Sequence, residues 1–141
     1  MNLLEEIHAS FPVKEVDLRQ YAPLKLAYLG DAVYEMVIRT ICVKRANMQT
    51  QKLHRKVTGY VSAKAQAKMM DALIGELTEE EESIYRRGRN SKPYTKAKNA
   101  SMEEYLKATG FEALVGYLYL QKEYERMNAL IARGIEALQE K

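Results

Sequence analysis

Two carboxylates stand in segments of the sequence that are otherwise apolar. Asp31 lies in LAYLGDAVYEM, and Glu112 lies in GFEALVGYLYL. Burying an unpaired carboxylate costs several kcal/mol, so each must meet a cation, a hydrogen-bond donor or a metal ion. An ion pair with an Arg or Lys is the ordinary explanation for one such acid. A metal is the alternative here, because the two acids occupy the two most apolar helices, which should cross in the core.

Mg²⁺ suits two converging carboxylates. It prefers hard oxygen ligands and keeps most of its waters while taking one or two protein carboxylates. A water bound to Mg²⁺ is a nucleophile for phosphodiester hydrolysis, and the ion offsets the charge that builds up on the phosphate. The two acids therefore indicate metal-dependent phosphodiester chemistry, although their spacing alone does not distinguish it from structural pairing.

The charges of the chain are strongly segregated, although the net charge is only +3. Met36–Met70 and Arg86–Met102 contain no Asp or Glu. Their basic residues are Arg39, Lys44, Arg45, Lys52, Arg55, Lys56, Lys64 and Lys68 in the first segment, and Arg86, Arg87, Arg89, Lys92, Lys96 and Lys98 in the second. Such a surface can hold a polyanion, because each phosphate that it neutralises releases counterions. The alternative is a basic face that is simply solvated.

The hydrophobic periodicity predicts an all-α fold of about seven helices, in one domain over residues 1–141. The segment Ala22–Arg45 is apolar almost all round, which is typical of a central helix. Glu79–Glu82 follow Thr78, so they are expected to lie at the positive end of a helix dipole. The expected helices are a short one near Leu3–Ile7, then Ala22–Arg45, Gln51–Val57 up to a break at Gly59, Ala63–Ile74 capped by Ser62, one starting at Thr78, one opening at the Ser101/Glu104 capping box, and a last amphipathic helix over Met127–Leu138. Asn90–Ala100 is expected to be a basic loop.

Other classes of protein fit the sequence less well. No apolar run approaches the roughly 18 residues of a membrane span, and no leader pattern opens the chain. The single cysteine, Cys42, allows no intrachain disulfide and is expected to be a buried thiol. We therefore expect a soluble, cytoplasmic protein.

Two motifs resemble the ribonuclease III family. LAYLGDAV resembles its signature helix, NERLEFLGDAV, and FEALVGYLYL resembles its second catalytic segment, DTFEALIGAIYL. With VSAKAQA and RRGRNSK between them, the chain is similar to the Mini-ribonuclease III branch, which consists of the catalytic domain alone. The resemblance implies a homodimer that cleaves double-stranded RNA with Mg²⁺, or Mn²⁺ as a substitute, in maturation of the 23S ribosomal RNA precursor. No double-stranded-RNA-binding domain is expected after the last helix.

The resemblance transfers two catalytic and metal-binding residues, Asp31 and Glu112. Leu24, Ala27 and Thr109 stand where the larger enzymes of the family carry acids, which leaves the number of metal ions per site open. Glu35 lies one turn beyond Asp31, so it either supports the site or pairs with Arg39. We favour the pairing.

The remaining assignments concern RNA and the second subunit. A-form RNA is recognised through phosphates and 2′-hydroxyls, so scattered basic and polar residues suit it, and stacking on tyrosines is the weaker hypothesis. The expected RNA contacts are Arg55, Ser62, Lys64, Arg86, Arg87, Arg89, Asn90 and Lys92. Tyr28 falls where the family has a ring that inserts into the partner subunit, and the alternative is an ordinary core residue. Two other functions remain open: a catalytically silent RNA-binding dimer, and a helical interaction protein.

Overall fold

The computed structural model describes residues 2–45, 47–91 and 101–139. These residues form seven α-helices and two short 3-10 helices, and no strand occurs among them. In chain order the elements are α1 (Leu3–Ser10), η1 (Leu18–Gln20), α2 (Pro23–Arg45), α3 (Thr50–Val61), α4 (Ala63–Leu73), η2 (Ile74–Glu76), α5 (Glu79–Arg89), α6 (Met102–Leu120) and α7 (Tyr124–Gln139). The all-α prediction is confirmed.

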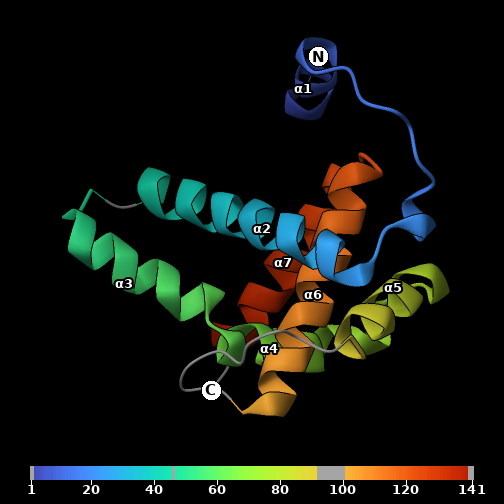
Figure 1. Ribbon diagram of the computed structural model, residues 1–141. Helices are drawn as coiled ribbons and strands as arrows, with labels where there is room; N and C mark the ends of the chain where they lie inside the picture. The colour runs from blue at the N-terminus through green and yellow to red at the C-terminus, as the bar shows by residue number, and fades with distance from the viewer. Residues whose placement is uncertain (1, 46, 92–100, 140–141) are drawn as a thin grey trace.

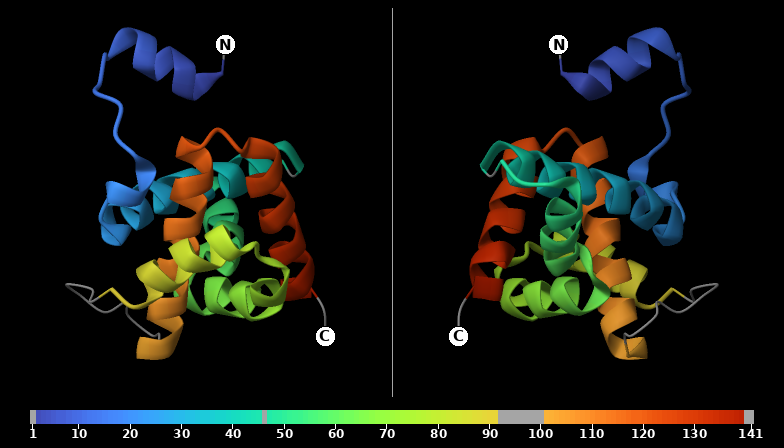
Figure 2. Two further views of the ribbon diagram at one scale, coloured as in Figure 1. Left: turned by 90° about the vertical axis from the view of Figure 1, so that its right-hand side faces the viewer. Right: turned by 90° about the vertical axis from the view of Figure 1, so that its left-hand side faces the viewer.

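Helix α6 is the centre of the molecule. Its residues from Ala108 to Tyr119 are buried except for Glu112, which is half-buried, and α2, α4, α5 and α7 pack around it (Figures 1 and 2). Tyr34 of α2 meets Phe111 of α6 edge to face, with ring centroids 5.0 Å apart.

The prediction that Ala22–Arg45 forms a central helix is wrong for the single chain. Helix α2 buries one side against α6 and leaves Tyr28, Met36 and Val43 exposed on the other. Apolar residues on every side of a helix therefore do not identify the central helix here, because part of the apolar surface of α2 faces outward from the molecule.

A glycine on each helix lets α2 and α6 touch. A Cβ added to Gly30 would collide with the backbone carbonyl of Glu112, and one added to Gly116 would collide with that of Leu26. Only residues without a side chain permit this approach. The crossing point thus lies beside both Asp31, which follows Gly30, and Glu112.

The predicted helix starts are confirmed at three places. Ser62 accepts a hydrogen bond from the Ala65 amide at the start of α4. Ser101 and Glu104 form a complete capping box at the start of α6. Thr78 caps the start of α5, where its side chain accepts a hydrogen bond from the Glu81 amide.

The expected break at Gly59 is wrong, since α3 runs on to Val61. A single glycine costs a helix only about 1 kcal/mol. Packing of Val57, Tyr60 and Val61 against the core outweighs that cost.

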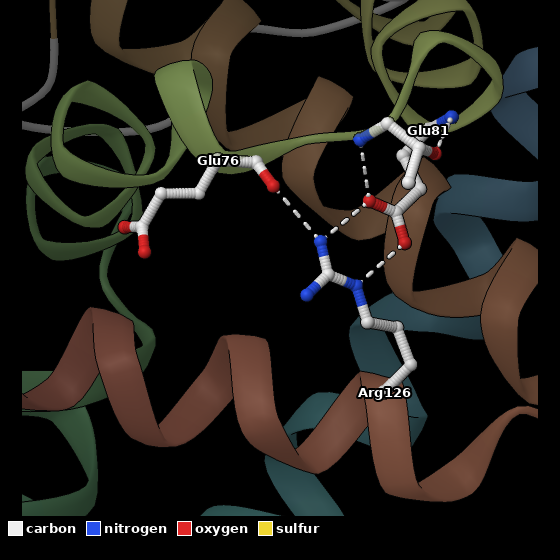
Figure 3. A network of polar contacts seen from close by, with 4 residues as sticks. Glu76, Glu81 and Arg126 are labelled. Carbon is white, nitrogen blue, oxygen red and sulfur yellow. Dashed lines mark hydrogen bonds and ion pairs between the residues drawn. The ribbon is translucent and has the colours of Figure 1, made fainter.

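The acidic run has a structural role at the start of α5, as the sequence predicts. Thr78 and Glu81 form a second capping box. Glu81 is buried and receives two hydrogen bonds of 2.8 Å from Arg126 of α7 (Figure 3). Arg126 also donates to the backbone carbonyl of Glu76, so this network ties α7 to the segment that leads into α5. The Arg126 hydrogen bonds hold the pKa of Glu81 below its ordinary value.

Helix α1 lies at the edge of the molecule, beyond the turn between α6 and α7 (Figure 2). Leu4 is its one buried residue. Cys42 of α2 is buried as predicted. None of the helices described here is long and apolar enough to cross a bilayer.

Candidate active site

Asp31 and Glu112 come together where α2 crosses α6. The pKa of the Glu112 carboxyl is raised from 4.5 to about 9, first by burial, then by the negative charge of Asp31 and by a hydrogen bond with that side chain. Two carboxylates this close resist ionising together. A proton or a cation bound between the two carboxylates would therefore relieve their repulsion and stabilise the pair.

The two carboxylates are not equally buried, which corrects the expectation that both are core residues. Asp31 is exposed, because it follows Gly30 onto the outer side of α2, whereas Glu112 is half-buried on α6. The site thus has one acid at the surface and one beneath it. A phosphate approaching from solvent would reach Asp31 without any rearrangement of the core.

Gln66 of α4 is the third polar side chain at this crossing. It is only 1% exposed. Its Nε2 donates to the Val61 carbonyl at 2.8 Å and to Glu112 Oε2 at 3.4 Å. The hydrogen bond to Glu112 lowers the pKa of that carboxyl, against the larger effect of burial.

The donor set fits a hydrated Mg²⁺ better than a protein cage. Within the described ranges, no group of three or more His, Cys, Asp or Glu residues is arranged to hold a metal. Two carboxylates with room for water are what Mg²⁺ takes from a protein, and their mutual repulsion is what a divalent cation relieves.

Glu35 and Thr109 are engaged in other contacts. The Glu35 carboxylate forms an ion pair of 2.7 Å with Arg39, as favoured from the sequence. The Thr109 hydroxyl is buried and donates to the Tyr105 carbonyl one turn earlier in α6. In this arrangement neither residue adds a ligand to the carboxylate pair.

The candidate RNA contacts come from α3, from the start of α4 and from the end of α5. Arg55, Lys64, Arg87 and Arg89 are exposed, whereas Ser62 is half-buried and caps α4. The Arg86 guanidinium donates to Glu82 one turn earlier, at 2.7 Å for its shorter hydrogen bond, so part of its charge is already neutralised.

Two of these assignments lie at or beyond the end of α5. Asn90 is its C-cap. Lys92, together with most of the expected basic loop, lies outside the described residues. Helices α3 and α5 lie on opposite sides of α6 (Figures 1 and 2), so the basic segments flank the helix that carries Glu112.

Tyr28 is 85% exposed. The alternative that it is an ordinary core residue of the subunit is therefore wrong. Met36 and Val43 of the same helix are also exposed, at 46% and 63%. This apolar side of α2 has no partner within the described part of the chain.

Sequence reasoning missed Gln66 as part of the site. The segment VSAKAQA, which contains Gln66, indicated only a resemblance to the family and no role for this residue. The signal that would find Gln66 is its position in α4, between Ala65 and Ala67 and four residues before Met70, where helical spacing places an amide among core residues. A buried amide must find partners, and the partners of the Gln66 nitrogen are the Val61 carbonyl and Glu112.

A family model described as the ribonuclease III domain matches residues 24–123. The chain therefore belongs to the ribonuclease III family. The crystal structure of a protein from Fusobacterium nucleatum has this fold, with a TM-score of 0.78 and 33% identity, and the match covers 86% of this chain and 98% of the other.

Curated relatives narrow the assignment within that family. A protein from Enterococcus faecalis named Mini-ribonuclease 3 is 53% identical over 82% of this chain and 89% of its own length. Another of that name, from Streptococcus pneumoniae, is 43% identical over 88% of this chain and 98% of its own length. The chain is thus of the Mini-ribonuclease 3 type and is an endoribonuclease, in agreement with the first of the three hypotheses from the sequence.

Proposed function

We propose that this protein cleaves double-stranded RNA with Mg²⁺ held by Asp31 and Glu112. The observation that carries the proposal is the convergence of these two carboxylates at the glycine crossing of α2 and α6. When bound, the ion would supply an activated water and offset charge on the phosphate. Mn²⁺, which also accepts oxygen ligands, is expected to substitute.

The two acids have distinct tasks in this proposal. Asp31 is exposed, so it would be the acid that an approaching phosphodiester reaches, and it would be one of the two residues that hold the ion. Glu112 is half-buried and would be the second residue that holds the ion; it would have to lose its proton to do so, since metal ligands bind deprotonated. The Gln66 amide then donates to a Glu112 oxygen that remains an acceptor.

Exposed basic side chains would hold the duplex. Arg55 on α3, Lys64 at the start of α4, and Arg87 and Arg89 at the end of α5 are exposed charges that would pair with phosphates irrespective of base sequence. We assign supporting contacts to Ser62, Arg86, Asn90 and Lys92.

The test is cleavage of a long RNA duplex by Asp31→Asn and Glu112→Gln. Both variants keep the shape of the side chain and remove its charge, so each should abolish cleavage while duplex binding measured without metal stays within about twofold of the wild type. Cleavage near the wild-type rate by either variant, with Mg²⁺ present, would overturn the site assignment.

We propose a homodimer built on the exposed side of α2. Tyr28 would insert into the partner subunit, and Met36 and Val43 extend the apolar surface that a second copy would cover. Twofold pairing uses the same surface on both subunits, and it would provide one carboxylate pair for each RNA strand.

The natural substrate that we propose is a duplex in the 23S ribosomal RNA precursor, processed in the cytoplasm. The similarity to the Mini-ribonuclease 3 relatives supports this proposal. Cleavage of a transcript that carries the precursor stems should exceed cleavage of an unrelated duplex of equal length. Equal rates on the two substrates would contradict it.

A further inference from the structure

Gln66 is an unusual residue to find in the core of α4. Its side chain is 1% exposed, and the helix positions around it are filled by Ala65, Ala67, Met69 and Met70, all buried. Replacing an amide by an apolar group of the same shape costs little where the amide has no task. Its presence beside Glu112 therefore requires an explanation.

The orientation of the Gln66 amide is fixed by its hydrogen bond to the Val61 carbonyl, which anchors it. The Val61 carbonyl can only accept hydrogen bonds, so the NH₂ group and not the oxygen must face it, at 2.8 Å. The second hydrogen of the same NH₂ group is then available to Glu112 Oε2, at 3.4 Å. Because an NH₂ group only donates, it selects the orientation of Glu112 that presents an accepting oxygen.

The anchor itself is held in place. Val61 is the last residue of α3, where the carbonyl groups have no partner within the helix. The neighbouring Tyr60 carbonyl accepts a 2.7 Å hydrogen bond from Tyr34 Oη of α2. Burial raises the pKa of Tyr34 far above its ordinary value, so this hydroxyl stays a donor. The end of α3 is thereby fastened to α2 one turn after Asp31.

The remaining polar atom of the Gln66 side chain is the amide oxygen, Oε1. Gln66 Oε1 is buried and has no hydrogen-bond partner among the described residues. An unsatisfied buried acceptor costs free energy and needs a reason. This acceptor belongs to the same amide whose nitrogen contacts Glu112, so the unsatisfied group lies beside the carboxylate pair and not elsewhere in the core.

We propose that Gln66 is a positioning residue of the active site: its amide links the end of α3 to Glu112 and holds that carboxylate in the orientation that binds the cation beside Asp31. This inference rests on the proposed metal site. Residues that hold a metal ligand in place typically contribute about tenfold to a hundredfold in affinity or activity.

The test is Gln66→Met, which keeps the length of the side chain and removes both hydrogen bonds. Metal binding is read without RNA, as the rise in unfolding temperature of the protein during Mg²⁺ titration. We expect the Mg²⁺ concentration at half-effect to rise about tenfold or more, and kcat on an RNA duplex to fall by a similar factor, with KM within about twofold of the wild type.

Met70→Ala is the matched control, because Met70 is equally buried on α4, one turn further along. It should lower the unfolding temperature through the cavity that it creates, yet keep the Mg²⁺ half-point and kcat of the wild type. If Gln66→Met does not fold, Gln66→Leu is measured with the same expectations, since leucine also fills the site without an amide.

Asp31→Asn distinguishes a failure of the positioning role of Gln66 from a failure of the proposed metal site. If Asp31→Asn abolishes the Mg²⁺ response while Gln66→Met behaves as the wild type, the positioning role falls and the metal site stands. If Asp31→Asn responds to Mg²⁺ as the wild type does, the metal site itself is wrong. A Met70→Ala variant with the same loss of Mg²⁺ response as Gln66→Met would reduce Gln66 to a packing residue.

Discussion

Glu112→Gln should make the metal-free protein more stable while it destroys the active site. Glu112 is costly to the folded chain, because burial and the charge of Asp31 raise its pKa from 4.5 to about 9. In the unfolded chain the same group ionises freely above its ordinary pKa. Between these two values, folding must keep a proton on Glu112 that the unfolded chain gives up.

The magnitude follows from the two pKa values. At about pH 7 the unfolded carboxyl is roughly 2.5 pH units above its ordinary pKa, and each unit is worth about 1.4 kcal/mol, so the wild type loses about 3 kcal/mol of stability relative to acid conditions. A raised pKa makes this contribution fully favourable below pH 4.5 and progressively lost as pH rises towards 9. The glutamine of the variant cannot ionise, and its amide can still donate to Asp31.

The assay is urea unfolding with EDTA, at two pH values, on wild type and variant. The variant should be more stable by about 3 kcal/mol at about pH 7 and by less than about 1 kcal/mol at about pH 5. Glu125→Gln, which replaces an exposed carboxylate of α7, is the control and should change stability by less than about 0.5 kcal/mol at either pH.

Adding Mg²⁺ should reverse the order of the two proteins. If the proposed site is correct, the ion should bind the folded wild type and not the variant, and so should stabilise the wild type alone. Because binding displaces the Glu112 proton, the effect should grow as pH rises. The reasoning is refuted if Glu112→Gln is less stable than the wild type in EDTA at about pH 7, or if the difference is the same at both pH values.

Three further predictions concern other parts of the molecule. Tyr28→Ala should leave a folded but largely monomeric protein by light scattering, since truncating a buried aromatic costs about 3–5 kcal/mol and a symmetric interface loses two; an intact dimer would contradict the proposed interface. Replacing Arg87 and Arg89 by Ala should weaken binding to all duplexes alike and reduce the salt slope by about one log unit for each phosphate that is no longer neutralised, and an unchanged slope would place the RNA elsewhere. Glu81→Gln should cost about 2–3 kcal/mol near neutral pH, because it leaves the Arg126 guanidinium without its charged partner. Since the pKa of Glu81 is lowered in the folded chain, this cost should shrink as pH falls below the ordinary carboxyl pKa, and a cost that persists in acid would argue against the ion pair.

The local signals in the sequence predicted local structure well. Ser62, Thr78 and Ser101 cap the helices that they were expected to cap, because a hydroxyl at that position satisfies backbone donors within the same turn. The convergence of the two apolar helices was also predicted, since each carried an acid within an apolar segment; the glycines at the crossing were not part of that prediction. The two helices thus carry both the glycines at which they touch and the acids of the candidate site.

Properties that depend on the third dimension were not predictable in the same way. The all-round apolar pattern of α2 could not reveal that α6, not α2, is enclosed, because the pattern records which residues avoid water and not what covers them. The exposure of Asp31 and the hydrogen bond from Gln66 to Glu112 depend on how α2, α4 and α6 meet. The break predicted at Gly59 was wrong because a glycine lowers helix stability only slightly, and the packing of the neighbouring residues against the core, which the sequence does not show, outweighs that loss.

The glycine crossing has a consequence for how this enzyme can vary. Because main chain touches main chain at Gly30 and Gly116, the backbones that carry Asp31 and Glu112 are as close as two helices allow. A methyl group at either position would push the helices apart and widen the gap between the acids in the same movement. The geometry of the proposed ion site would therefore depend on the backbone, and selection on catalysis would act on how tightly two helices pack.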